Sequence, residues 1–171
     1  MTTPAVTNDN PNASLRLSAE GRRAMRSPTR EGVVNGYYND GGKTKGNCTF
    51  GVGIKVHDGP CSAKELKTPL TLVQIEAAFN SAVIWAENGI KRHVKKQALT
   101  QAQFDALVSF VFNVGVGRSI TVLNRIDHGE LDKAAAIMTS MNTSNQNGKP
   151  VFMRGLVRRR QEETAPFRVT P

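Results

Sequence analysis

The stretch 30-REGVVNGYYNDGGKTKGNCTFGVG-53 holds two acids, Glu31 and Asp40, nine positions apart, and has little apolar content. Its second half mixes Gly with Thr, Val and Phe, a composition that predicts short twisted strands joined by tight turns. We expect these strands between Tyr37 and Ile54. The stretch therefore predicts a small β lobe that carries two carboxylates.

The sequence on either side of this stretch predicts helices. Downstream, apolar residues recur at spacings of three and four from Leu72 to Val94, behind Thr71 as an N-cap. A second helix starts near Thr100 and ends at Gly115, and its broad apolar face predicts that it is the most buried element. Further elements are a short helix capped by Ser18, helices at about 119–127, 130–141 and 154–164, and between the last two a polar loop, "NTSNQNGKP".

Length and composition predict a single folded domain. The chain has 171 residues, 39% of them hydrophobic, which is enough for one buried core. Residues 1–14 are rich in Thr, Asn, Pro and Ser and are predicted to be a disordered tail. The domain then covers 15–171, with a β lobe at about 31–68 and a helical lobe at about 71–167. The expected fold class is α+β, mainly α, with a long helix joining the lobes and a cleft between them.

The chain is strongly basic, with 23 Lys and Arg against 14 acids and a formal net charge of +9. This charge favours binding to a polyanion such as nucleic acid, anionic lipid or a bacterial surface polymer. The basic residues are spread over several helices with few aromatics, so no nucleic-acid platform is expected. No apolar run reaches the roughly 20 residues that span a bilayer, and the first residues lack a signal-peptide pattern. We expect a soluble monomer.

Two carboxylates at a cleft can perform glycoside hydrolysis, because one acid protonates the leaving oxygen and one carboxylate activates water or attacks the sugar. Glu31 and Asp40 are candidates for this pair. The alternative is that both are ordinary solvated acids, and their spacing alone does not separate the two. His57, His93 and His128 lie on different predicted elements, so we expect neither a metal site nor a cofactor. The chain also lacks a phosphate-binding loop and a nucleophile elbow.

Five segments together resemble the phage-type lysozymes, the muramidase family of endolysins. They are "EG" at 31–32, "YYND" at 37–40, "CTFGVG" at 48–53, "LTQAQFDALVSFVFNVGVG" at 99–117 and "GLVRRRQEE" at 155–163. The resemblance covers nearly the whole chain. It implies a lysozyme-like fold and, without a cofactor, inverting hydrolysis of the β-1,4 bond between N-acetylmuramic acid and N-acetylglucosamine in peptidoglycan, which lyses the cell.

The resemblance also implies the roles of three residues. Glu31 would be the general acid, Asp40 the carboxylate that activates water, and Thr49 the hydroxyl that helps to hold that water. Desolvation at the base of a cleft can keep a Glu protonated, while an Asp on a solvated turn stays ionised. Asp40 and Thr49 are nine positions apart where the family usually has six, so the turn "GGKTKGN" is about three residues longer. Thr44 is the alternative to Thr49.

One arginine matches the position where the family places a basic side chain beside the catalytic Glu. This is Arg158, the first residue of the "RRR" run. The alternative is that Arg158 lies on a solvated face of the last helix, which is what we expect of Arg159 and Arg160.

Two residues that are typical of the family are missing. The His that usually follows the G-x-G run is absent after Gly53, although His57 comes slightly later. A Trp that usually follows the penultimate helix is replaced near Met141, which leaves Trp85 as the single Trp. Substrate contacts at these two positions are expected to differ from those of the family.

The two cysteines, Cys48 and Cys61, lie on either side of one predicted β segment. They could join across a hairpin, and the resemblance implies a comparable "NCT…GPC" arrangement in relatives. They could also remain two unpaired thiols, as is usual for a protein made in the cytoplasm. Our hypothesis is that a disulfide forms in an oxidising periplasm and fixes Thr49 relative to Asp40.

Two other functions remain open at this point. A lytic transglycosylase cleaves the same bond with one Glu and no activated water, and Asp40 and Thr49 favour hydrolysis over it. A catalytically inactive basic protein could instead bind cell wall or nucleic acid. We expect synthesis in the bacterial cytoplasm and action in the periplasm or cell wall, after release through a phage holin or delivery as an effector.

Overall fold

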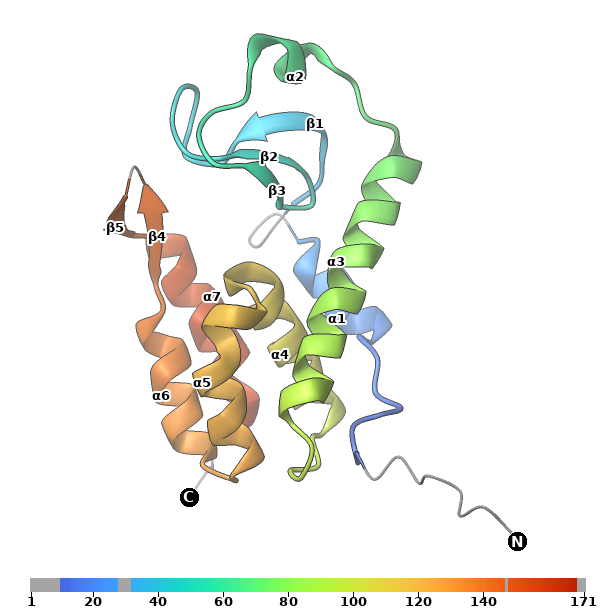
Figure 1. Ribbon diagram of the computed structural model, residues 1–171, viewed down its shortest axis with the longest axis vertical. Helices are drawn as coiled ribbons and strands as arrows, with labels where there is room; N and C mark the ends of the chain where they lie inside the picture. The colour runs from blue at the N-terminus through green and yellow to red at the C-terminus, as the bar shows by residue number, and fades with distance from the viewer. Residues whose placement is uncertain (1–9, 28–31, 147, 169–171) are drawn as a thin grey trace, which may run out of the picture.

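The computed structural model describes residues 10–27, 32–146 and 148–168, and it has the expected α+β, mainly α architecture. A small sheet forms one lobe, a bundle of helices forms the other, and a long helix, α3, runs between them (Figure 1). None of the helices in the described ranges is long and apolar enough to cross a membrane.

The β lobe is a three-stranded antiparallel sheet. Its strands are β1 (Val34–Asn39), β2 (Cys48–Gly51) and β3 (Ile54–His57), in the order β1-β2-β3. The short helix α2 (Ala63–Lys67) follows it and was not predicted. Ser62 and Glu65 form a capping box at its start, a local signal that stabilises even five helical residues.

The connecting helix α3 (Leu72–His93) begins behind Thr71 as predicted, because the Thr71 side chain and Gln74 form a capping box. One side of α3 is buried against the helical lobe, and basic residues fill its last turn, where they complement the helix dipole. Leu72 and Val73, at the other end, are exposed. This helix contacts both the helical lobe and the sheet.

The helical lobe is built around α4 (Gln101–Val114), which packs against α1 (Ala19–Met25), α3, α5 (Val116–Asp127) and α7 (Arg154–Thr164). Helix α6 (Leu131–Ser140) and a 3-10 turn, η1 (Ala165–Phe167), complete it. The predicted helices are confirmed, although α5 starts three residues before the expected position. The core is one cluster, centred on Phe79, Phe104, Leu107, Phe110 and Ile126.

The predicted polar loop "NTSNQNGKP" is wrong, because the structure has a two-stranded hairpin there. Strands β4 (Thr143–Gln146) and β5 (Lys149–Phe152) pair in antiparallel register on the side of the helical lobe that faces the sheet (Figure 1). All four side chains of β5 are exposed, so the hairpin lacks the apolar alternation that identifies a half-buried strand. The dipeptide Asn-Gly at 147–148 was the available turn signal.

Residues 10–14, assigned by composition to a disordered tail, are ordered; residues 1–9 lie outside the described residues. Asn12 is buried, with 1% of its surface exposed. Its amide donates to the carbonyl oxygens of Val94 and Gln97 and accepts from the backbone N–H of Leu99. One polar side chain thus satisfies the backbone groups between α3 and α4, a long-range arrangement that composition does not reveal.

Candidate active site

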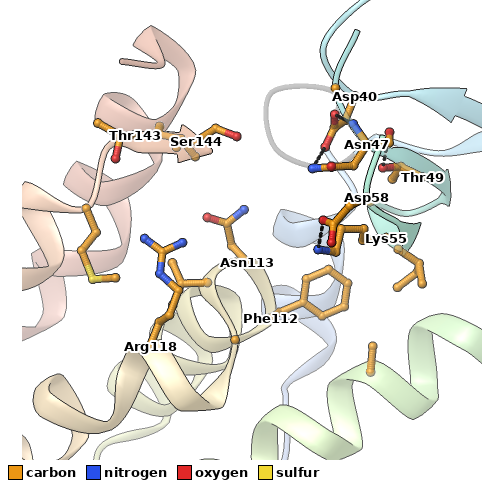
Figure 2. A pocket seen from close by; sticks show the side chains of 18 of the residues that line it. Asp40, Asn47, Thr49, Lys55, Asp58, Phe112, Asn113, Arg118, Thr143 and Ser144 are labelled. Atoms are coloured by element: carbon orange, nitrogen blue, oxygen red, sulfur yellow. Dashed lines mark hydrogen bonds and ion pairs between the residues drawn. The ribbon is translucent and has the colours of Figure 1, made fainter. Parts of the chain in front are cut away.

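A cavity of about 880 Å³ lies between the two lobes. In Figure 2, Asp40, Asn47, Thr49, Lys55 and Asp58 line its β wall, and Thr143 and Ser144 face them from the opposite side. Asn113, Arg118 and Phe112 come from the chain around the α4–α5 junction. Residues of five separate segments, the β lobe, α3, the α4–α5 junction, the chain around Thr143 and α7, therefore meet around one space, which is large enough for a saccharide of several rings.

The register of the sheet brings Asp40 and Thr49 to the same wall of the cavity. Tyr38 pairs with Thr49 and Asn39 pairs with Cys48 across β1 and β2. Because successive side chains of a strand point to opposite faces, Tyr38 and Thr49 share a face, and Asp40, two residues after Tyr38, continues it. Tyr38, Asp40 and Thr49 line the cavity accordingly.

Asn47 closes the long turn between Asp40 and Thr49. The backbone N–H of Asp40 donates to the carbonyl oxygen of Asn47 over 3.1 Å. In return, the backbone N–H of Asn47 donates to Asp40 Oδ1 over 2.5 Å, and Asn47 Nδ2 donates to Oδ2 over 3.4 Å. Gly42 and Gly46 have φ of 110° and 89°, which a side chain would strain, so the turn needs glycine there.

The Thr49 hydroxyl is held by the same residue. Thr49 is buried, with 3% of its surface exposed, and its Oγ1 donates to the carbonyl oxygen of Asn47 over 3.3 Å. Thr44, the alternative to Thr49, is exposed within the turn and does not line the cavity. The geometry favours Thr49 for contact with anything bound in the cavity.

Cys48 and Cys61 are joined by a disulfide bond. Cys48 is fully buried, and the bond closes the segment that contains β2 and β3. Asn39 supports the same junction, because its Oδ1 accepts from the backbone N–H of Cys61 over 2.7 Å. The residue before Thr49 is thus anchored covalently to the chain that leaves the sheet.

The three arginines of α7 lie in different environments, and Arg158 has the solvated position that was the alternative prediction for it. Arg158 is exposed, pairs with Glu162 over 3.1 Å and does not line the cavity. Arg159 and Arg160, expected on a solvated face, are buried instead. Arg160 lines the cavity and bonds Glu163, Asn113 and the carbonyl oxygen of Met141.

Glu31, the predicted general acid, lies outside the described residues. The described chain resumes at Gly32, whose N–H donates to the carbonyl oxygen of Ser27 over 3.0 Å. The structure therefore leaves the role of Glu31, and any contact between it and Arg158, as predictions.

The positions without the usual His and Trp are occupied by other side chains. Ile54 and Lys55 line the cavity, and Lys55 forms an ion pair with Asp58 over 2.8 Å. Met141 also lines the cavity. Trp85, on α3, lines the cavity with 49% of its surface exposed. No sequence pattern placed Trp85 at the cavity, because its helical position alone was equally consistent with the core.

His57 is not among the residues that line the cavity. Its ring nitrogens contact the carbonyl oxygen of Asp58 and Glu65 Oε1, each over 3.0 Å, and these two hydrogen bonds raise the pKa of His57. Cys48, His57 and Glu65 place one sulfur, nitrogen or oxygen atom each within 4.8 Å of one another. The sulfur belongs to the disulfide and offers no thiolate, so this group does not form a metal site.

The cavity thus presents an exposed carboxylate, a fixed hydroxyl beside it and polar groups on the facing wall. A carboxylate can take a proton from a water molecule, and a hydroxyl that donates to a carbonyl still has lone pairs to accept from that water. The described residues can therefore orient and deprotonate a water molecule. Protonation of a leaving group requires a further acid, for which the sequence offers Glu31.

Comparison with known proteins shows that most of the chain matches one protein family. The sequence pattern that defines the phage lysozymes matches residues 29–163. An endolysin of Bacillus phage PZA is 39% identical over 100 residues, which is 57% of this chain and 37% of that protein. An endolysin of Acyrthosiphon pisum secondary endosymbiont phage 1 is 38% identical over 74 residues, 42% of this chain and 51% of that protein. The chain thus spans about a third to a half of the length of these relatives.

Solved structures resemble the whole domain. An endolysin from Escherichia coli O157:H7 phage FAHEc1 has a TM-score of 0.66 and 28% identity, covering 90% of this chain and 94% of that one. The muramidase domain of SpmX from Asticaccaulis excentricus has a TM-score of 0.67 and 26% identity, covering 92% and 99%. Both cover the β lobe and the helical lobe together.

Proposed function

The chain belongs to the phage lysozyme family, and on this basis we propose that it is a glycosidase that hydrolyses the peptidoglycan of bacterial cell walls. The bond cleaved is the β-1,4 bond between N-acetylmuramic acid and N-acetylglucosamine. The observation that supports this proposal is the position of Asp40 and Thr49 on one wall of a cavity of about 880 Å³ between two lobes.

We propose an inverting mechanism. Glu31 protonates the glycosidic oxygen as the bond to the anomeric carbon breaks, and Asp40 takes a proton from the water that attacks the opposite face of the sugar. Thr49 Oγ1 donates its own hydrogen to Asn47 and accepts the second hydrogen of that water. An inverting pair has carboxyl groups about 6.5–9.5 Å apart, which leaves room for this water. The step leaves Glu31 ionised and Asp40 protonated; proton exchange with solvent restores both, so that each turnover consumes one water.

The other walls of the cavity suit a glycan. Asn113, Thr143 and Ser144 offer amide and hydroxyl groups opposite Asp40 (Figure 2). Arg118, an exposed cation on the same rim, can attract the carboxylates of the peptide stems that N-acetylmuramic acid carries. A cavity that combines polar side chains with aromatic ones, such as Tyr38 and Trp85, suits a sugar polymer.

We also propose where and how the protein acts. Its formal charge of +9 draws it to the anionic polymers of the wall, where it acts as a monomer. The protein is made in the cytoplasm and released to the wall, and the Cys48–Cys61 disulfide forms on arrival in an oxidising compartment.

Clearance of purified cell-wall suspensions tests the function. Wild type should clear the suspension, and Glu31→Gln and Asp40→Asn should each reduce the rate at least about a hundredfold, the effect expected when a positioned acid or base is lost. The control is Glu20→Gln, which makes the same charge change at an exposed position on α1 and should keep wild-type activity.

The product identifies the reaction. Early NMR of the released reducing end should show the α anomer. An anhydro-muramic end would indicate a lytic transglycosylase instead. Binding to walls with no release of reducing ends by wild type would show that the protein is a binder and not an enzyme.

A further inference from the structure

Asn47 forms five hydrogen bonds around the predicted water-activating pair. Two are donated to the Asp40 carboxylate, from the backbone N–H and from Nδ2. The Asn47 carbonyl oxygen accepts two more, from the Asp40 N–H and from Thr49 Oγ1. Asn47 Oδ1 accepts the fifth, from the backbone N–H of Gly59 over 3.3 Å. One residue therefore contacts both members of the pair and a third segment of the lobe.

These contacts restrict the conformation of the long turn between Asp40 and Asn47. Between Asp40 and Asn47 lie six residues, three of them glycine, and such a turn has many accessible conformations. Catalytic groups that move by about 1 Å lose on the order of a hundredfold in rate. The reciprocal backbone bonds between Asp40 and Asn47 close the turn at its base, and the bond to Gly59 orients the Asn47 side chain.

We propose that Asn47 is a positioning residue that holds Asp40 and Thr49 in register for the attacking water. The proposal rests on the hydrolytic function above and concerns a residue to which neither the family resemblance nor the pairing of acids assigns a role. The Thr49 hydroxyl donates its hydrogen bond to the Asn47 carbonyl oxygen. Thr49 Oγ1 is therefore available to the water as an acceptor. The water then donates to Asp40 and to Thr49, and its oxygen lone pair is left for the anomeric carbon.

Two variants separate the effect of losing the Asn47 side-chain hydrogen bonds from the effect of adding a charge. Asn47→Ala removes the bonds of Nδ2 and Oδ1 and should lower kcat on soluble peptidoglycan fragments about tenfold. Asn47→Asp keeps the acceptor for Gly59 but places a second carboxylate beside Asp40, and should lower kcat about a hundredfold. KM should stay within about twofold in both, because the water is positioned and not the sugar.

Asn39→Ala is the matched control. Asn39 ties the same turn to Lys43 and Cys61 but makes no contact with the Asp40 carboxylate and does not line the cavity. It should lower the melting temperature while kcat stays within about twofold of wild type. Equal losses of kcat in Asn39→Ala and Asn47→Ala would mean that Asn47 acts only through the stability of the turn, and would overturn the proposal.

A double-mutant cycle gives the second readout. In an Asp40→Asn background, Asn47→Ala should reduce the residual rate by less than about twofold, because the group that it positions is already gone. An undiminished tenfold effect there would also overturn the proposal. Equal wall activity in wild type and Asp40→Asn would instead reject the hydrolytic mechanism itself. This outcome is distinct from the two that overturn the role of Asn47.

Amide exchange tests the contact without any turnover. The backbone N–H of Asn47 should exchange slowly in wild type and at least about tenfold faster in Asp40→Ala, as expected for a charge-assisted hydrogen bond. An equally fast exchange in both proteins would show that the turn is not closed by this bond, and would reject the positioning role even in an inactive protein.

Discussion

Arg158, Arg159 and Arg160 are consecutive and chemically identical, yet their environments differ. Arg158 keeps 71% of its side chain exposed, whereas Arg160 keeps 1%. Consecutive helical residues lie about 100° apart, so three neighbours cannot share one face. Sequence similarity to a motif aligned the first arginine with the site, and the packing of α7 against α4 and α6 brought the third one to the cavity.

We expect Arg160→Ala to destabilise the protein by about 3–5 kcal/mol, because it leaves the buried carboxylate of Glu163 without one of its cationic partners. Arg158→Ala should change the free energy of unfolding by less than about 1 kcal/mol, since its ion pair is exposed. Urea denaturation of the two variants measures the difference. Equal effects would show that the burial of Arg160 has no energetic consequence.

Two polar side chains, those of Asn12 and Asp127, hold the connection between α3 and α4 through hydrogen bonds to its backbone. Asn12 fixes residues near the start of the described chain to the α3–α4 connection, and Asp127 accepts from the backbone N–H groups of Lys95, Lys96 and Gln97 in the same connection. These backbone hydrogen bonds lower the pKa of Asp127 against an opposing effect of burial. The connection is thus held by side chains remote in sequence.

The β2–β3 hairpin is the element on which the candidate water site depends. Its covalent tie, Cys48–Cys61, spans a sequence separation of 13. In the chain-entropy account, closing a loop of about this length contributes roughly 3 kcal/mol through the unfolded state. The disulfide should therefore matter more for stability than for the shape of the sheet, which the backbone ladder already defines.

Reduction of the disulfide should lower the melting temperature by about 6–12 °C, from roughly 3 kcal/mol and the scaling for a protein of this size. Differential scanning calorimetry with and without a dithiol reductant measures this shift. Thiol titration of air-oxidised, unfolded protein should find no free Cys. Two titratable thiols in that sample, or an unchanged melting temperature after complete reduction, would contradict the prediction.

The turn between α5 and α6 carries an ion-pair cluster that depends on pH. Hydrogen bonds from Arg125, and then from Lys133, lower the pKa of Glu130 from 4.5 to about 2. A carboxyl group with a lowered folded-state pKa stabilises the fold above its unfolded pKa and loses that contribution as the pH falls through its folded pKa. The contribution of Glu130 should thus be complete above about pH 4.5 and absent near pH 2.

Glu130→Gln should therefore lower the melting temperature at pH 7, and the difference from wild type should close between about pH 4.5 and pH 2. Thermal unfolding at a series of pH values measures it. In a background with Arg125→Gln and Lys133→Gln, the same substitution should have little effect at any pH. A difference that stays constant down to pH 2 would mean that the stabilisation does not come from the charge of Glu130.

The assembled molecule places its single tryptophan at the cavity between the lobes. Trp85 has 49% of its surface exposed and lines the same space as Asp40 and Thr143. A glycan bound in that space would cover part of the indole and exclude water from it. Because the chain has one Trp, the intrinsic tryptophan emission comes from this position alone.

Titration of the Asp40→Asn variant with peptidoglycan fragments should shift the Trp85 emission to the blue and reach saturation, without turnover during the measurement. Trp85→Phe should lose the signal, and its binding can be followed by calorimetry. Emission that stays constant while calorimetry detects binding would show that the glycan does not reach this end of the cavity.

Much of the fold follows from local patterns. Ser18 and Thr71 were predicted as caps and Thr100 as the start of a helix, and each accepts from a backbone N–H in the first turn of its helix. Gly115 ends α4 with a φ of 88°, as a glycine at that position can. The candidate pair Asp40 and Thr49 also came from a local motif. In each of these features the interacting residues lie close together in the chain, so a local sequence pattern can predict the feature.

The features that the sequence did not predict involve residues that are far apart in the chain. The sequence by itself determined the longer helices, the caps Ser18 and Thr71, the presence of short strands in the β lobe and the family motif, because propensity and periodicity act within one or two turns. Only the tertiary structure decided that Arg160 lies at the cavity, that Asn12 is buried, that Trp85 faces the cavity and that β4 and β5 pair. Burial and long-range hydrogen bonding depend on which surfaces meet after folding, and no local pattern specifies that meeting.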